Sequence, residues 1–318
     1  MFAVSPDVAR PGLIGQGGGM SRAASPAIAF AVGVLGIATF SMMDAAMKGL
    51  GLTIGTYNAL FWRGIVIVAL GAAVHFARRP TAPSREAMVL HLRRGMVALV
   101  MSFLFFWGLA RVPMAQAISL SYIAPLLAIF LAALLLGEKV GRASIAGSLA
   151  ALTGIGIILF GQSRADLGDA AFLGSVAILG SAICYSYNLI LARQQALRAG
   201  PTEIAFWQSL FVLTGLALAA PWAAVLPPAD AWPKIVIAAV LGMISLMLLA
   251  WAYARGEASY LAPTEYSSFV WAALFGHVFF GERVTGYTLA GATMIVAGCL
   301  YAARRRPRPF VDAETQLP

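Results

Sequence analysis

Residues 107–157 read WGLARVPMAQAISLSYIAPLLAIFLAALLLGEKVGRASIAGSLAALTGIGI, and a related sequence follows 144 positions later, at residues 251–301. Eleven of the aligned residues are identical, including the pairs Gly137-Glu138 and Gly281-Glu282. Each copy runs from a Trp-x-x-Ala-Arg segment through an apolar stretch to the Gly-Glu turn, and then into a second apolar stretch with spaced glycines. This pattern predicts two apolar helices joined by a short polar turn, present twice in the chain.

The composition indicates a membrane protein. Hydrophobic residues make up 60% of the 318 residues and charged residues only 11%, and the mean hydropathy is +0.83. Soluble domains carry roughly 25% charged residues, so charges as sparse as these cannot cover a soluble surface. The net charge of +9 lies largely in short segments between apolar runs. That distribution is typical of an oriented membrane protein rather than of a nucleic-acid-binding one.

Ten apolar runs follow residues 1–26, which we expect to be a disordered tail. Each run has about the 20 residues needed to cross the hydrocarbon core, where backbone groups must be paired within a helix. We therefore predict an all-α integral membrane protein with ten transmembrane helices. The helices are placed near residues 27–49, 56–77, 92–110, 114–136, 144–161, 170–192, 202–220, 233–254, 258–280 and 286–303.

The distribution of Lys and Arg predicts the orientation. With a cytoplasmic N-terminus, 16 of these residues fall in cytoplasmic segments and 5 in outer segments. Positive residues concentrate on the cytoplasmic side of membrane proteins. We therefore expect both termini in the cytoplasm of a bacterial cell, with the chain in the inner membrane and residues 304–318 as a basic C-terminal tail.

The repeat extends back into the earlier helices. Asp44 aligns with Asn188 and Gly36 with Gly180 at the same offset, so each unit contains five predicted helices, at residues 27–161 and 168–303. Because five is odd, the second unit enters the membrane upside down. Inverted repeats are typical of secondary transporters, whose substrate site lies between the repeats near the bilayer midplane.

With these motifs the chain resembles the EamA branch of the drug/metabolite transporter superfamily. The resemblance rests on the stretch from Met114 to Gly137-Glu138-Lys139-Val140, on Gly281-Glu282-Arg283-Val284, and on the glycines at 147, 154, 291 and 298. It implies an inner-membrane permease or exporter of small metabolites, with residues 144–161 and 286–303 peripheral to the cavity. One departure is Phe269, which stands where the first copy has Pro125, so we expect the two halves to bend differently.

Polar side chains inside apolar runs are the candidate substrate contacts, because burying such groups in lipid is costly. We interpret Glu138 and Glu282 as turn residues held by neighbouring charges. We predict no catalytic residue, metal ligand or cofactor, and interpret Cys184 and Cys299 as small buried side chains. The predicted substrate-binding residues are Asp44, Arg63, Gln116, Ser119, Tyr122, Tyr185, Asn188, Gln208, Glu265, Tyr266 and Trp271.

Charges of both signs beside aromatic residues favour a substrate with both charges and an apolar part, such as an amino acid. We therefore predict a secondary transporter that works by alternating access, coupled to protons or to exchange. An uncoupled facilitator and a membrane-embedded enzyme acting on a lipid-linked substrate are the alternatives. The expected partners are the substrate, the lipid bilayer, protons and a second copy of the chain, but not nucleic acid.

Two charge arrangements are predicted in more detail. Asp44 and Arg63 fall at similar depths on either side of the first helical turn, so we expect them within pairing distance, directly or through the substrate, at an outer gate. The competing interpretation pairs Asp44 with Lys48 at i,i+4 and lets Arg63 extend outward. Glu265, about 10 Å into its helix, is expected to face the central cavity and is a candidate for proton coupling.

Overall fold

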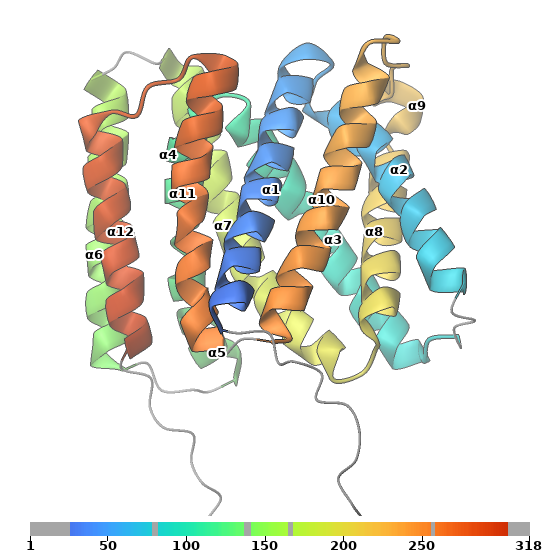
Figure 1. The fold of residues 1–318 in the computed structure, drawn as a ribbon, viewed down its shortest axis with the longest axis horizontal. Coiled ribbons are helices and arrows are strands. Elements are labelled where there is room, and N and C mark those ends of the chain that lie inside the picture. Colours follow the sequence, from blue (N-terminus) through green and yellow to red (C-terminus); the bar gives the residue numbers. More distant parts are fainter. Residues whose placement is uncertain (1–25, 78–81, 137–140, 165–167, 256–257, 305–318) are drawn as a thin grey trace, which may run out of the picture.

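The computed structural model describes residues 26–77, 82–136, 141–164, 168–255 and 258–304, and within these residues the chain is all-helical, without a strand. The helices lie side by side in a bundle (Figure 1). They are α1 (Pro26–Thr53), α2 (Thr56–Ala77), α3 (Arg85–Leu109), α4 (Met114–Ser121), α5 (Ala124–Leu136), α6 (Arg142–Arg164), α7 (Gly168–Ala196), α8 (Pro201–Ala217), α9 (Ala220–Ala223), α10 (Ala231–Tyr253), α11 (Ala258–Phe280) and α12 (Gly286–Arg304).

The bundle has two ends. α1 begins and α12 finishes at the same end, which we call the terminal end (Figure 1). The turn between α1 and α2 lies at the opposite end, which we call the turn end. Gly55 in this turn has a φ of 81°, a left-handed conformation that glycine adopts without steric cost. The glycine therefore allows the chain to reverse direction between two long helices.

Seven segments of the described chain are long and apolar enough to cross a membrane. The chain is thus a multi-pass membrane protein by the length and composition of its helices. Ten spans stay a prediction. The seven segments are Ala27–Thr53, Thr56–Ala77, Arg85–Leu109, Met114–Leu131, Arg142–Gly161, Gly168–Ala196 and Ala231–Tyr253.

α3 begins at Arg85, seven residues before the predicted start at residue 92. The Ser84 side chain accepts a hydrogen bond from the backbone N–H of Ala87 and caps the helix. Glu86 places a negative charge in the first turn, where the helix dipole favours it. The predicted start was too late because Arg85, Glu86 and the polar residues near them lie outside the apolar run.

The predicted helix 114–136 is interrupted between α4 and α5, at Tyr122 and Ile123. The Ser119 and Ser121 hydroxyls donate to backbone carbonyls four residues earlier, a bonding pattern that bends helices. Pro125 follows at once and lacks a backbone N–H. The corresponding α11 is continuous, so the two copies bend differently, as the Pro125/Phe269 difference predicts.

α6 and α12 cross at closely apposed glycines. A Cβ added at Gly154 would lie 2.6 Å from the carbonyl oxygen of Gly291, and a Cβ added at Gly298 would lie 2.5 Å from that of Gly147. A side chain at either position would force the helices apart. Gly154 and Gly298 are equivalent in the repeat, and so are Gly147 and Gly291, since each pair is 144 residues apart. The two contacts are therefore equivalent, with the roles of α6 and α12 exchanged.

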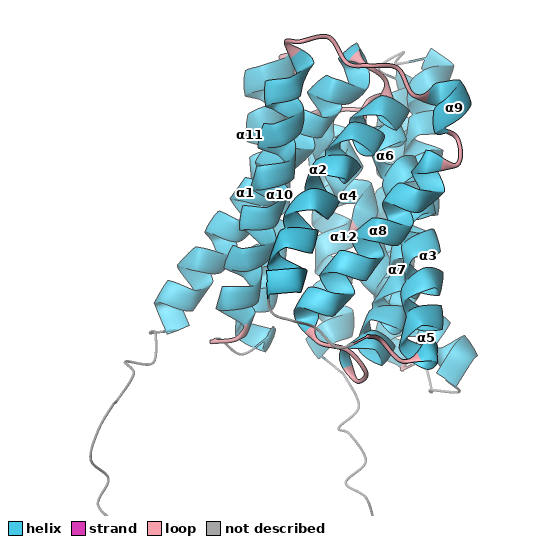
Figure 2. Cartoon of the chain, turned by 90° about the vertical axis from the view of Figure 1, so that its right-hand side faces the viewer, coloured by secondary structure: helices cyan, strands magenta, loops and turns pink. Residues whose placement is uncertain are grey.

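Two further helix pairs are related in the same way. α1 packs along α10, and α7 packs along α3 (Figures 1 and 2). Gly36 of α1 lies against Leu249 and Leu248 of α10, and Gly180 of α7 lies against Leu104, the repeat equivalent of Leu248, on α3. The positions again differ by 144. Each pair joins an early helix to a late one, so the two sequence halves are interleaved in space.

Candidate substrate-binding site

Asp44 and Arg63 lie in the half of the bundle nearer the turn end, on α1 and α2. Asp44 is 1% exposed, and neither its carboxylate oxygens nor the Arg63 Nε has a hydrogen-bond partner. The charge of each residue acts on the other. The guanidinium lies over the Phe106 ring, 5.9 Å from its centroid. Within the described residues Asp44 and Arg63 form no ion pair, so the predicted direct contact is not made in this structure.

Lys48 does not pair with Asp44, and the competing interpretation of the sequence is therefore wrong. The Lys48 Nζ donates to the Val112 carbonyl oxygen and forms an ion pair with Glu282 Oε1, each at 2.5 Å. The other Glu282 oxygen accepts from the Met114 backbone N–H at 2.7 Å. Glu282 outcompetes Asp44 because its carboxylate also accepts from the first N–H of α4, at the positive end of that helix dipole.

The Gly-Glu motif explains how Glu282 reaches this position. Gly281 has a φ of 66°, and its N–H donates to the His277 carbonyl oxygen at 2.9 Å, which ends α11 in a left-handed cap. The chain then turns back, and Glu282 Oε2 lies where a Cβ on Gly276 would be only 2.5 Å away. Glu282 is a turn residue held by a charge, as predicted, but the charge is Lys48 rather than the adjacent arginine. Glu138 lies outside the described residues.

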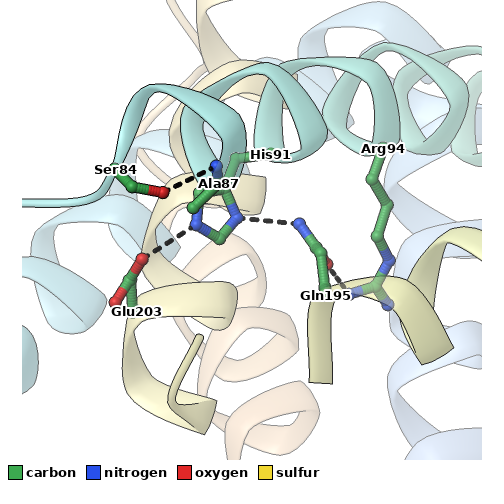
Figure 3. A network of polar contacts seen from close by, with 6 residues as sticks. All are labelled: Ser84, Ala87, His91, Arg94, Gln195 and Glu203. Atoms are coloured by element: carbon green, nitrogen blue, oxygen red, sulfur yellow. Dashed lines mark hydrogen bonds and ion pairs between the residues drawn. The ribbon is translucent and has the colours of Figure 1, made fainter. Parts of the chain in front are cut away.

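A second polar cluster lies toward the terminal end and joins α3, α7 and α8 (Figure 3). Arg94 donates from Nε to Asn188 Oδ1 at 3.0 Å and from Nη1 to Gln195 Oε1 at 2.5 Å. The Gln195 Nε2 lies 2.8 Å from His91 Nδ1, and His91 Nε2 lies 3.0 Å from Glu203 Oε1. If Gln195 donates to Nδ1, the imidazole carries its proton on Nε2 and donates to Glu203. His91 is fully buried, and its side chain fixes the amide that contacts Arg94.

Glu265 lies on α11 in the same half of the bundle and is exposed. The Tyr253 hydroxyl donates to its Oε1 at 2.8 Å. Tyr185 of α7 is 42% exposed, and the charges of both Glu265 and Arg94 act on its hydroxyl. The structure therefore brings Glu265 and Tyr185 into one region, between α7, α10 and α11.

Tyr122 and Tyr266 meet near the middle of the bundle, with ring centroids 5.3 Å apart. The Tyr122 hydroxyl lies 2.7 Å from the Ser268 hydroxyl and accepts from the Phe269 N–H at 2.9 Å. These bonds tie the break between α4 and α5 to α11, so Tyr122 holds the fold as well as lining the middle of the bundle.

The other predicted residues lie apart from these clusters. Gln116 donates to Ser175 at 3.1 Å, which links α4 to α7, and Ser119 bonds within its own helix. Trp271 stacks on Phe275, and its indole N–H is buried without a hydrogen-bond partner. Gln208 is half-buried on α8. Of the described residues, Gln208 and Trp271 bond to no other predicted site residue.

Sequence reasoning missed Arg94, Gln195, Tyr253 and the Lys48 pairing with Glu282. Arg94 falls near the start of the predicted helix 92–110 and was counted only among the cytoplasmic positive charges. The Ser84 cap and the acid at Glu86 are helix-start signals that place it well inside α3. The partners of Lys48 are 64 and 234 residues away in the chain, so no local pattern could reveal them.

The described residues contain no group of three or more His, Cys, Asp or Glu side chains able to hold a metal ion. Cys184 is half-buried, Cys299 is buried, and both are free thiols. The Cys299 thiol lies 3.2 Å from the Tyr122 carbonyl oxygen, which the interruption of the helix leaves available.

Comparison with known proteins identifies the family. The model of the EamA-like transporter family matches twice, at residues 27–160 and 172–304. The chain belongs to the EamA-like transporter family. The pseudopaline exporter CntI of Pseudomonas aeruginosa is 27% identical to it over 277 residues, which cover 86% of this chain and 95% of the relative.

Other relatives are named for other transported molecules. A riboflavin transporter of Rhizobium johnstonii is 33% identical to this chain, and the aligned region covers 69% of this chain and 71% of the relative. A probable terminal-alkyne amino-acid exporter of Streptantibioticus cattleyicolor is 28% identical, covering 76% and 80%. A solved structure described only as the crystal structure of a protein has a TM-score of 0.59 at 23% identity, over 89% of this chain and 100% of that one. That likeness bears on the fold alone.

These comparisons establish the general activity. These relatives are named as transporters or exporters, so the chain is a membrane transporter of a small molecule and not an enzyme.

Proposed function

We propose that the chain is a secondary transporter built from two inverted five-helix repeats, at residues 27–161 and 168–303, that alternate in opening to the two sides of the membrane. The exchanged glycine contacts of α6 and α12 support this, because they are what a two-fold axis in the membrane plane produces. The matched pairs α1–α10 and α3–α7 obey the same relation. The double match of the family model supports it independently.

The terminal end is proposed to face the cytoplasm, with the chain in the bacterial inner membrane. The 16-to-5 excess of Lys and Arg in the corresponding segments supports this orientation. Reporter fusions at Pro318 and near Gly168 should report cytoplasmic and periplasmic positions respectively. The reverse pattern would overturn the orientation.

We propose that the state seen in this structure is closed at the turn end and that the terminal end is the side that admits substrate. The Lys48–Glu282 ion pair joins α1 to the segment after α11 at the turn end. Toward the terminal end, α1 and α10 slant away from α7 and α8 (Figure 2). Glu265, Tyr185 and Tyr253, all in that half, are exposed. A carrier in this state accepts substrate from the cytoplasmic side.

We propose that the cargo is a small amphipathic or zwitterionic metabolite such as an amino acid, moved by export or exchange. The observation that carries this is the charge distribution inside the bundle. Buried Asp44 and half-buried Arg63 lie toward one end, and Glu265 with exposed tyrosines lies toward the other. Intramembrane charges are costly and mark substrate pathways. The eleven residues predicted from the sequence stand as the proposed contacts, with Asp44 and Arg63 at the outer gate.

Reconstitution into proteoliposomes tests the function. Labelled amino acid loaded inside should exchange for external unlabelled amino acid, and a pH gradient should shift the rate if protons are coupled. Equal rates with and without the gradient, together with no stimulation by exchange substrate, would identify an uncoupled facilitator. No flux of any neutral amino acid above that of empty liposomes would refute the substrate class.

A further inference from the structure

Arg94 is a positive charge on a membrane-spanning helix with no acidic partner among the residues that the structure describes. Its hydrogen bonds go to two amides, Asn188 and Gln195. We propose that Arg94 and Glu265 form a divided site for a zwitterion, in which Arg94 binds the carboxylate and Glu265 the ammonium group of an amphipathic amino acid. This rests on the proposed function and assigns the two charged ends of its cargo.

Neighbouring amides orient the Arg94 side chain but do not neutralise its charge. Amide oxygens accept from Nε and Nη1 and hold the guanidinium in place without neutralising it. Gln195 is 1% exposed and is itself held by the fully buried His91 (Figure 3). An oriented guanidinium suits a carboxylate, which it binds through parallel N–H groups. Such pre-organisation lowers the entropy lost when the ligand binds.

Glu265 shows the same arrangement with the opposite charge. Its described side-chain partner is the phenol of Tyr253, which donates to Oε1 at 2.8 Å, so the carboxylate is oriented by a neutral group and has no cationic partner among the described residues. Tyr185 lies on α7 three residues before Asn188, the residue that Arg94 Nε contacts, and the charges of both Glu265 and Arg94 act on its hydroxyl. The exposed rings of Tyr185 and Tyr253 offer an apolar and cation-binding surface for the rest of the ligand.

Neither charge is required by the repeat. The positions equivalent to Arg94 and Glu265 in the other half are Ala238 and Ser121, which are small and uncharged. The fold therefore accommodates a neutral residue at each site. Two opposite charges confined to one half of an otherwise matched scaffold indicate a role in recognition.

Three probe ligands test which charge each residue binds. Phenylalanine carries both charges, phenylalaninamide lacks the carboxylate, and N-acetylphenylalanine lacks the ammonium group. Wild-type protein in nanodiscs should bind phenylalanine more tightly than either derivative. Arg94→Gln should lower affinity for phenylalanine about tenfold or more and leave phenylalaninamide unchanged, because a charge-assisted hydrogen bond is lost. Glu265→Gln should lower the affinity for phenylalanine and leave the affinity for N-acetylphenylalanine unchanged, because that derivative has no ammonium group.

Arg93→Gln is the matched control, because Arg93 is adjacent on α3 and exposed; it should leave all three affinities unchanged. Arg94→Lys should restore part of the preference for phenylalanine. If Arg94→Gln weakened all three probes equally while remaining folded, Arg94 would be a structural cross-link and the inference would be wrong. If wild-type protein bound none of the probes, the proposed substrate class would fail and this inference with it.

Discussion

Two half-buried arginines lie on membrane-spanning helices, and their surroundings are opposite in kind. Toward the turn end, Arg63 has a carboxylate nearby but no hydrogen bond from Nε, and both Asp44 oxygens are unpaired. Toward the terminal end, Arg94 is hydrogen-bonded by amides but has no described acid beside it. The repeat places Asp44 and Asn188 at equivalent positions, but the arginines beside them come from different helices, Arg63 from α2 and Arg94 from α3.

The comparison separates charge balance from hydrogen bonding. The pair near the turn end is balanced in charge but not fixed in geometry, and can therefore change partners at little cost when that end opens. The cluster near the terminal end is fixed in geometry but not balanced in charge, which suits a binding group that stays in place. Four variants test this distinction, and their expected effects on stability fall in the order below.

Arg63→Gln should have the largest effect, because it leaves the buried Asp44 carboxylate without its compensating charge. Leaving a buried charge without a compensating one costs about 3–5 kcal/mol. Adding Asp44→Asn should recover most of that loss, since the double variant carries the residues of the second repeat, Asn188 and Gln208. Unfolding in detergent measures both. A double variant no more stable than Arg63→Gln would show that the two charges are not coupled.

Lys48→Met should have the next largest effect, about 2 kcal/mol, because the Glu282 side chain is 17% exposed and water can replace part of the lost interaction. The turn end should also open more often. A cysteine at Gly51 should then react faster with a charged, membrane-impermeant thiol reagent, while Cys184 in the other half of the bundle serves as the internal control. Unchanged labelling would mean that the ion pair does not restrain this end.

Arg94→Gln should cost only about 1 kcal/mol of stability, since the lost bonds are ordinary side-chain hydrogen bonds and no buried charge is left uncompensated. A glutamine can still donate to one of the two amides. The unfolding transition should therefore stay well above that of Arg63→Gln. A loss as large as that of Arg63→Gln would contradict the contrast between the two sites.

Gly242→Ala should have the smallest effect. An added Cβ would lie 3.2 Å from Arg63 Nη2 and 3.7 Å from the Met43 side chain, so the guanidinium must shift by a few tenths of an ångström. The equivalent position in the first repeat is Ala98, which is already accommodated. We expect a loss of about 1 kcal/mol or less, and a larger loss would mean that Arg63 is held more rigidly than its free Nε indicates.

The sequence predicts the helical segments well because apolar runs and glycines mark their lengths, and the structure places helices close to those positions. It fails where a local signal competes with a distant one. Lys48 had an acid one turn away, yet its partner is Glu282, since packing decides which carboxylate reaches the ammonium group. Arg94 was counted only among the cytoplasmic positive charges, because it stands beside Arg93 near the start of the predicted helix.

The candidate site was predictable in its residue types but not in its groupings. Asp44, Glu265 and Tyr185 stand out as polar groups in apolar runs, and the structure describes all three. Their partners come from other helices, and the sequence contains no information on how α3, α7, α10 and α11 face one another. The pairing of Glu265 with Tyr253 depends on the relative rotation of two helices, which packing sets.

The glycine crossing of α6 and α12 has the form of an isologous interface, in which the same surface meets itself across a two-fold axis. A single five-helix unit carrying glycines at the positions of 147 and 154 would present the complete contact surface to an identical, oppositely oriented copy. In such a dimer each glycine would occur in both symmetry-related contacts, so one substitution would disrupt both. Joining the two units in one chain removes that constraint. Each half can then diverge, and charges such as Arg94 and Glu265 can arise on one side of the membrane without being duplicated on the other.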